Sequence, residues 1–145
     1  MHKIQEVEQA KSLMTEAMEW SVMRWLREKK RVRKAADQAN AALDAMNRTV
    51  KDSWSHELSA AYEDLDSTRG SRANHSQKPA ISPDTRELAR KVKEADDQAY
   101  AARMDAEHTF DEAERLLSTS LAREGCKKAI HSWDLHEKAI RRAEA

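Results

Sequence analysis

Chain-breaking residues are rare in this sequence, and most of them gather in one place. Three of the four Gly and Pro residues lie within residues 67–83, and the fourth is Gly125. Because Gly and Pro are the strongest local signals for turns, a chain that lacks them offers few places to reverse direction. The sequence therefore predicts one reversal of the chain, at about residues 69–82.

The composition on both sides of this turn is typical of long helices. Charged residues make up 36% of the 145 residues and aromatic residues 5%, and Ala, Glu, Lys, Arg and Leu are abundant. Such a composition favours helices and coiled coils over a thick globular core or a disordered chain. We predict an all-α, single-domain protein over residues 1–145, in which a helix of about 3–68 and a helix of about 83–143 form a long antiparallel two-helix coiled-coil hairpin.

Apolar residues recur along both predicted helices in steps of three and four, which is the spacing of one helix face. Antiparallel pairing of the two apolar faces places Leu43 opposite Phe110 and Lys29 opposite Glu124. The spacing loses phase around Gly125, which predicts a local stutter or slight bend near residues 122–128. An alternative is that the helices fold back near Asn47 and Gly125 to give a compact four-helix bundle.

Residues 13–26 are apolar on more than one helix face, so a single neighbouring helix cannot cover them. This surface is either the core of a broader bundle or a docking site for a partner protein, since Met and Trp are common at both. A homodimer of hairpins, forming a dimeric four-helix bundle, would bury it. The predicted apolar contact residues are Leu13, Met14, Ala17, Met18, Trp20, Met23 and Leu26.

A basic band follows the apolar surface. Residues 24–34 carry seven basic residues and one acidic residue, and the predicted pairing brings the basic residues 123–128 beside them. The band is a solvated surface, a site for a protein partner, or a site for nucleic acid or an anionic surface. Lys plus Arg equals Asp plus Glu at 26 each, so the whole chain exerts no general attraction on polyanions. The predicted contact residues are Arg24, Arg27, Lys30, Arg31, Arg33, Lys34, Arg123, Lys127 and Lys128.

The sequence contains no motif for catalysis or for binding a cofactor. Asp105, His108 and Glu112, with Asp44 opposite, resemble only part of the ligand set of a carboxylate-bridged metal pair. His131 and His136 are five residues apart, so they do not share a helix face, and we expect both on the surface. Cys126 is expected to be a small buried residue. We predict that the protein is not an enzyme.

The single cysteine and the lack of a long apolar segment favour a cytoplasmic protein. The predicted function is that of a non-catalytic coiled-coil interaction module, such as a scaffold, adaptor, stalk or escort. Its expected partners are a second copy of itself and an unidentified protein. An alternative function is binding of nucleic acid or an anionic surface through the basic band, and a third is metal binding within a helical bundle.

Overall fold

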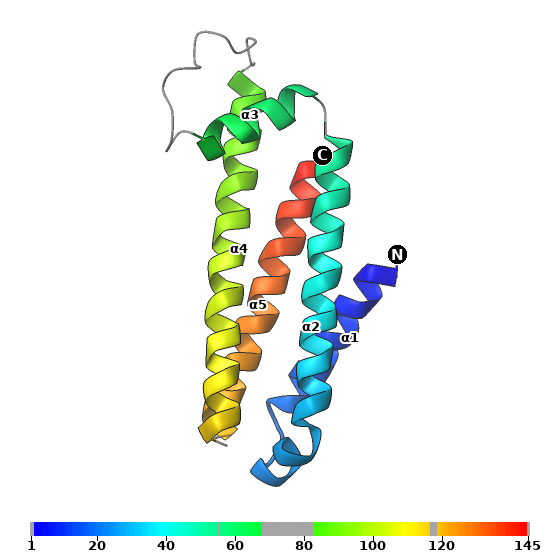
Figure 1. Ribbon diagram of the computed structural model, residues 1–145, viewed down its shortest axis with the longest axis vertical. Coiled ribbons are helices and arrows are strands. Elements are labelled where there is room, and N and C mark those ends of the chain that lie inside the picture. Colours follow the sequence, from blue (N-terminus) through cyan, green and yellow to red (C-terminus); the bar gives the residue numbers. More distant parts are fainter. Residues whose placement is uncertain (1, 55, 68–82, 117–118, 145) are drawn as a thin grey trace.

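The computed structural model describes residues 2–54, 56–67, 83–116 and 119–144 (Figure 1). The fold is all-α, as predicted: helices account for 96% of these residues, and none of them lies in a strand. Within the same residues, no helix is both long enough and apolar enough to cross a membrane. The five helices are α1 (His2–Ala17), α2 (Val22–Ser53), α3 (His56–Ser67), α4 (Pro83–Leu116) and α5 (Thr119–Glu144).

The long helices α2, α4 and α5 lie side by side, and α1 lies along one half of α2 (Figure 1). Successive helices of this group run in opposite directions, which is the arrangement of an up-and-down four-helix bundle. The short helix α3 packs across the other end, against α4. Four helices of one chain therefore surround a common interior along the half of the bundle that contains α1.

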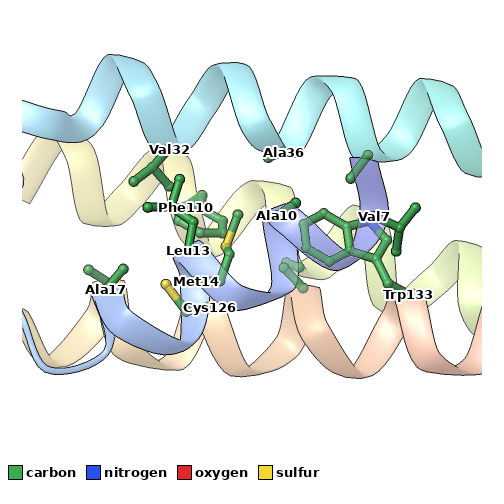
Figure 2. Packing of buried hydrophobic residues seen from close by; sticks show 14 of the residues in the cluster. Val7, Ala10, Leu13, Met14, Ala17, Val32, Ala36, Phe110, Cys126 and Trp133 are labelled. Carbon is green, nitrogen blue, oxygen red and sulfur yellow. The ribbon is translucent and has the colours of Figure 1, made fainter. Parts of the chain in front are cut away.

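One hydrophobic cluster joins α1, α2, α4 and α5. Side chains of α1 point into the same space as Val32 of α2, Phe110 of α4 and Trp133 of α5 (Figure 2). Burial of these apolar surfaces is the main source of stability in such a bundle. The cluster includes Val7, Ala10, Met14 and Ala17 of α1, Val32, Ala39 and Leu43 of α2, Phe110 and Ala113 of α4, and Cys126 and Trp133 of α5.

The continuous helix predicted over residues 3–68 is instead three helices, and its first interruption lies at residues 18–21. Ser21 is the N-cap of α2, and its hydroxyl accepts a hydrogen bond from the backbone N–H of Arg24 at 3.3 Å. On the other side of the turn, the Arg123 side chain of α5 donates to the carbonyl of Met18 at 3.0 Å. These contacts satisfy backbone groups that a helix end exposes. The turn lets α1 fold back along α2.

The second interruption follows Ser53, and it separates α2 from α3. The backbone N–H of Trp54 closes α2 by donating to the carbonyl of Lys51, and the Trp54 ring lies 5.3 Å from the ring of Tyr62 in α3. Leu58 of α3 is buried in a small cluster with Ala89 of α4. The alternative fold-back near residue 47 is wrong, because α2 continues through that position.

The second half of the chain differs from its prediction in a similar way. Helix α4 begins at Pro83, as predicted, whereas the predicted turn at 69–82 lies outside the described residues. Because α4 ends at Leu116 and α5 begins at Thr119, the single helix predicted over about 83–143 is two helices. The long two-helix hairpin is therefore replaced by a bundle with an additional reversal in each half.

The stutter or slight bend predicted near residues 122–128 does not break the helix, because α5 is helical throughout that range. A Cβ atom on Gly125 would lie 3.4 Å from the backbone nitrogen of Phe110 and 3.4 Å from the Thr109 methyl group. Gly125 therefore marks a close approach between α5 and α4 and does not interrupt the helix.

The predicted antiparallel pairing that places Lys29 opposite Glu124 is also wrong. Helix α5 runs in the same direction as α2, so that Trp133 contacts Asn40 and Ile140 shares a cluster with Val50. Glu124 pairs with Lys127 of its own helix. The antiparallel neighbour of α5 on this side is α1, whose Lys11 pairs with Asp134 and Glu137.

Candidate functional site

Most of the predicted apolar contact residues belong to the interior of this chain. Leu13, Met14, Ala17 and Trp20 are buried, and Met18 is partly buried against the same cluster. Met23 and Leu26 remain exposed, at 68% and 39%. We predicted that a homodimer would bury the whole apolar surface. Here most of it is buried within one chain, in the cluster that α1 shares with α2, α4 and α5.

Two tryptophans form the centre of the turn between α1 and α2. The rings of Trp20 and Trp25 meet edge to face with their centroids 5.6 Å apart, and Trp25 lies 6.1 Å from the ring of Phe110. The guanidinium of Arg24 lies over the Trp20 ring at 4.7 Å. Both indole N–H groups are buried, and neither has a hydrogen-bond partner among the residues that the structure describes. Such an arrangement gains apolar contact but leaves two polar groups unsatisfied.

Several basic residues of the predicted band form ion pairs within α2. Arg24 pairs with Glu28 at 3.0 Å, and Arg31 pairs with the same carboxylate at 3.3 Å. The hydrogen bond from Arg24 is the largest cause that lowers the pKa of Glu28. These charges are therefore partly neutralised by a neighbour on their own helix.

Other members of the band connect different helices. Arg33 of α2 pairs with Asp111 of α4 at 3.3 Å, and Lys128 of α5 pairs with Asp105 of α4 at 2.6 Å. Lys127 lies 3.8 Å from Glu124, while Arg123 is bound to the Met18 carbonyl as described above. The structure brings the two basic stretches to the same end of the bundle (Figure 1), and one cation of each pairs with an acidic residue of α4.

Three of the predicted contact residues on α2 form no ion pair or hydrogen bond with the described residues. Arg27, Lys30 and Lys34 are exposed, and no ion pair or hydrogen bond joins them to any part of the chain that the structure describes. At 100° per residue they share a helix face with the exposed Met23 and Leu26, opposite the buried Trp25, Val32 and Ala36. We call this the basic outer face: Met23, Leu26, Arg27, Lys30 and Lys34.

A solvent-open groove of about 450 Å³ runs beside this face, between α1 and α2. Glu6 and Glu16 line it from α1, and Arg31 and Lys34 line it from α2. The opposite charges of the two helices complement each other across the groove. The side chains of α1 therefore pack tightly on the core side and more loosely on the solvent side.

The four residues considered as metal ligands lie apart in charge pairs of their own. Asp44 pairs with Arg103 at 3.0 Å, Asp105 pairs with Lys128, and His108 lies 3.3 Å from Glu112. Among the described ranges there is no group of three or more His, Cys, Asp or Glu side chains placed to hold a metal ion.

The prediction that His136 lies on the surface is wrong, whereas His131 is exposed. His136 is buried at 8% exposure, and its Nδ1 lies 3.8 Å from Asp96 of α4. Asp96 also accepts a hydrogen bond from the Tyr62 hydroxyl of α3 at 3.1 Å. Burial is the main cause that lowers the pKa of His136. Its spacing from Trp133, three residues earlier on the same face, was the signal that could have indicated burial.

Cys126 is buried, as predicted, in the cluster shared by the four bundle helices. Desolvation raises the pKa of its thiol to about 12. Because the thiolate is the nucleophilic form of cysteine, this environment suppresses its reactivity despite the basic neighbours in sequence.

The basic outer face is the strongest candidate for an interaction surface. It presents three cations and two apolar side chains within about three helical turns, so it can bind a surface that combines carboxylates with apolar groups. No family model, no curated protein and no solved structure matches this chain. The function is therefore inferred from the site itself.

Proposed function

We propose that this protein is a non-catalytic interaction module, such as a scaffold, adaptor or escort, that binds an acidic amphipathic helix of a partner protein through the basic outer face. One observation carries this proposal. Arg27, Lys30 and Lys34 stay unpaired and exposed beside Met23, in the part of the chain that the structure describes, while the other predicted contact residues of the basic band are bound to groups of the same chain.

Charge pairing makes this face different from the rest of the band. A guanidinium or ammonium that already contacts a carboxylate has part of its charge neutralised, so it gains less from binding another anion. Arg33 and Lys128, which join two helices, are in this position. Arg27, Lys30 and Lys34 can instead bind a carboxylate with no loss of contacts to the described residues.

The apolar residues favour a protein helix over nucleic acid. Met23 is the most exposed large apolar residue of the described chain, and Leu26 lies one turn further along the same face. An amphipathic partner helix can place its own apolar residues on this pair and its carboxylates on the flanking cations. Binding of nucleic acid is dominated by contacts between cations and phosphates, to which the exposed apolar pair contributes nothing.

Charge reversal of the three cations tests the proposal. The probe is a synthetic helical peptide of about 20 residues with a Leu stripe flanked by Glu. We expect the variant Arg27→Glu, Lys30→Glu, Lys34→Glu to stay folded and to bind this peptide at least about tenfold more weakly, because three favourable pairs become repulsive and each exposed pair contributes up to about 1 kcal/mol. Isothermal titration calorimetry at low and physiological salt measures the change.

A matched control reverses three exposed basic residues elsewhere: Arg48→Glu, Lys91→Glu and Arg115→Glu. It has the same net charge as the test variant, so equal loss of binding in both would show a general charge effect and contradict the proposed face. Met23→Ala with Leu26→Ala should also weaken binding of the peptide. If the protein instead binds duplex DNA or vesicles of anionic lipid and ignores the peptide, the alternative function replaces this one.

A further inference from the structure

We propose that α1 is exchanged between two copies of this chain: α1 and α2 join into one long helix, and α1 of each copy docks in the bundle of the other. The interaction surface is the one that α1 already occupies on α2 and α5, and the partner is a second copy. This inference goes beyond the docking function proposed above and does not depend on it.

The link between α1 and α2 has the local sequence of a helix. Residues 18–21 are Met, Glu, Trp and Ser, with no Gly or Pro. Buried positions also keep their phase across the link, because Val7, Met14, Trp25, Val32 and Ala39 follow one another in steps of 7, 11, 7 and 7. Steps of 7 and 11 are close to two and three whole turns of helix. A joined helix would therefore carry the buried faces of α1 and α2 on one side.

The closed turn leaves polar groups unsatisfied at this link. The indole N–H groups of Trp20 and Trp25 are buried without a hydrogen-bond partner among the described residues. Unpaired buried donors destabilise the conformation that contains them. The two unsatisfied donors therefore lower the stability of the closed turn.

The geometry of the closed form can be reproduced between two copies. Helix α1 runs antiparallel to α2, with the turn at residues 18–21 between them. Two joined helices that lie antiparallel and cross near residue 20 place α1 of one chain beside α2 of the other in the same register. Every contact that α1 makes in the closed form, including Lys11 with Asp134 and Glu137, then forms between chains. Exchange of an identical element in this way is a low-cost route to a dimer.

The charges that hold α1 in place allow a test by complementation. Lys11→Glu sets a carboxylate against Asp134 and Glu137, and the second variant, Asp134→Lys with Glu137→Lys, sets two cations against Lys11. Each variant alone has a repulsive contact whether it is closed or exchanged with itself. In an exchanged heterodimer both contacts become attractive. The carboxylate introduced at position 11 of one chain faces the two ammonium groups introduced on α5 of the other, while the native Lys11 faces the native acids.

The two variants are mixed at high concentration in mild urea, refolded, and analysed by size-exclusion chromatography with light scattering and by thermal unfolding. We expect a 1:1 heterodimer whose midpoint of unfolding exceeds that of either variant alone. If the mixture contains only the two separate monomers, each with its own midpoint, the exchange is refuted. Both variants leave the basic outer face intact, so this result is independent of the peptide-binding test.

Two changes in the link provide a second measurement. Ser21→Ala removes the cap of the closed turn and should raise the fraction of dimer formed by the otherwise native chain. The association constant of the dimer should rise by about fivefold for each cap that is removed. Glu19→Gly disfavours the joined helix and should lower the dimer fraction by a similar factor. Sedimentation equilibrium measures both. An unchanged monomer–dimer equilibrium in the two variants would overturn the proposal even if the charge variants failed to fold.

Discussion

The indole Nε1 of Trp133 in α5 donates a hydrogen bond of 2.7 Å to the side-chain oxygen of Asn40 in α2. The amide nitrogen of Asn40 in turn donates to Glu107 of α4 at 3.1 Å. Trp133 is one of the largest fully buried side chains. One asparagine thus connects three helices through a chain of part-buried polar contacts, and a polar network of this kind helps to specify one register among apolar alternatives.

Replacement of Asn40 by Ala should therefore destabilise the protein. The change leaves the buried indole N–H of Trp133 without its acceptor, which costs about 1–3 kcal/mol of unfolding free energy. Urea denaturation followed by circular dichroism measures the loss. Gln38→Ala, on the exposed side of the same helix, is the control and should change stability by less than about 0.5 kcal/mol. Equal stability of both variants would show that the Trp133 contact is unimportant.

The buried His136 predicts a fall in stability at mildly acidic pH. Its pKa in the folded protein lies below the ordinary value of 6.5, so the unfolded chain binds more protons between the two values. The contribution of His136 to the free energy of unfolding is therefore fully present above about pH 6.5, and it is lost as the pH falls from there toward the pKa of the folded state. Among the charged groups that act on the ring, Asp96 and Asp44 raise its pKa and Arg103 lowers it, and each effect is smaller than that of burial.

Thermal unfolding between pH 7.5 and pH 5 measures this dependence. His136→Phe should flatten the curve in that interval, because the titrating group is gone, whereas His131→Phe at an exposed position should leave it unchanged. The lowered pKa of Glu28 acts in a separate interval, below its ordinary value of 4.5. A native protein with the same midpoint of unfolding at pH 7.5 and pH 5 would contradict the prediction for His136.

The close approach of α5 to α4 predicts opposite effects for two substitutions of Gly125. Gly125→Ala should stabilise the protein by up to about 1 kcal/mol, since Ala is the better helix former and the added Cβ meets its nearest neighbours at an ordinary contact distance of 3.4 Å. Gly125→Leu should destabilise it by about 1–3 kcal/mol, because the longer side chain must displace the backbone near Phe110. Differential scanning calorimetry distinguishes the two. A gain of stability with Leu would show that the two helices do not lie this close.

Local sequence preferences were sufficient for the helical elements and for some of their ends. The scarcity of Gly and Pro predicted an all-α fold, and Pro83 marked the first residue of α4 because its fixed φ angle suits the start of a helix. The burial of Cys126 followed from its small apolar character. The basic band was also visible in the sequence, although nothing local indicated which of its residues would find a partner.

The reversal at residues 18–21 was decided by tertiary structure alone. Met18, Glu19 and Trp20 differ from good helix formers by no more than about 0.7 kcal/mol each, so their propensities cannot position a break. The turn gains far more from burial of Trp20 against Trp25 and from docking of α1 on α2 and α5. The direction of α5 was also decided by contacts between residues distant in sequence, because these outweigh small local preferences. This direction sets the burial of His136 and the pairing of Lys128 with Asp105.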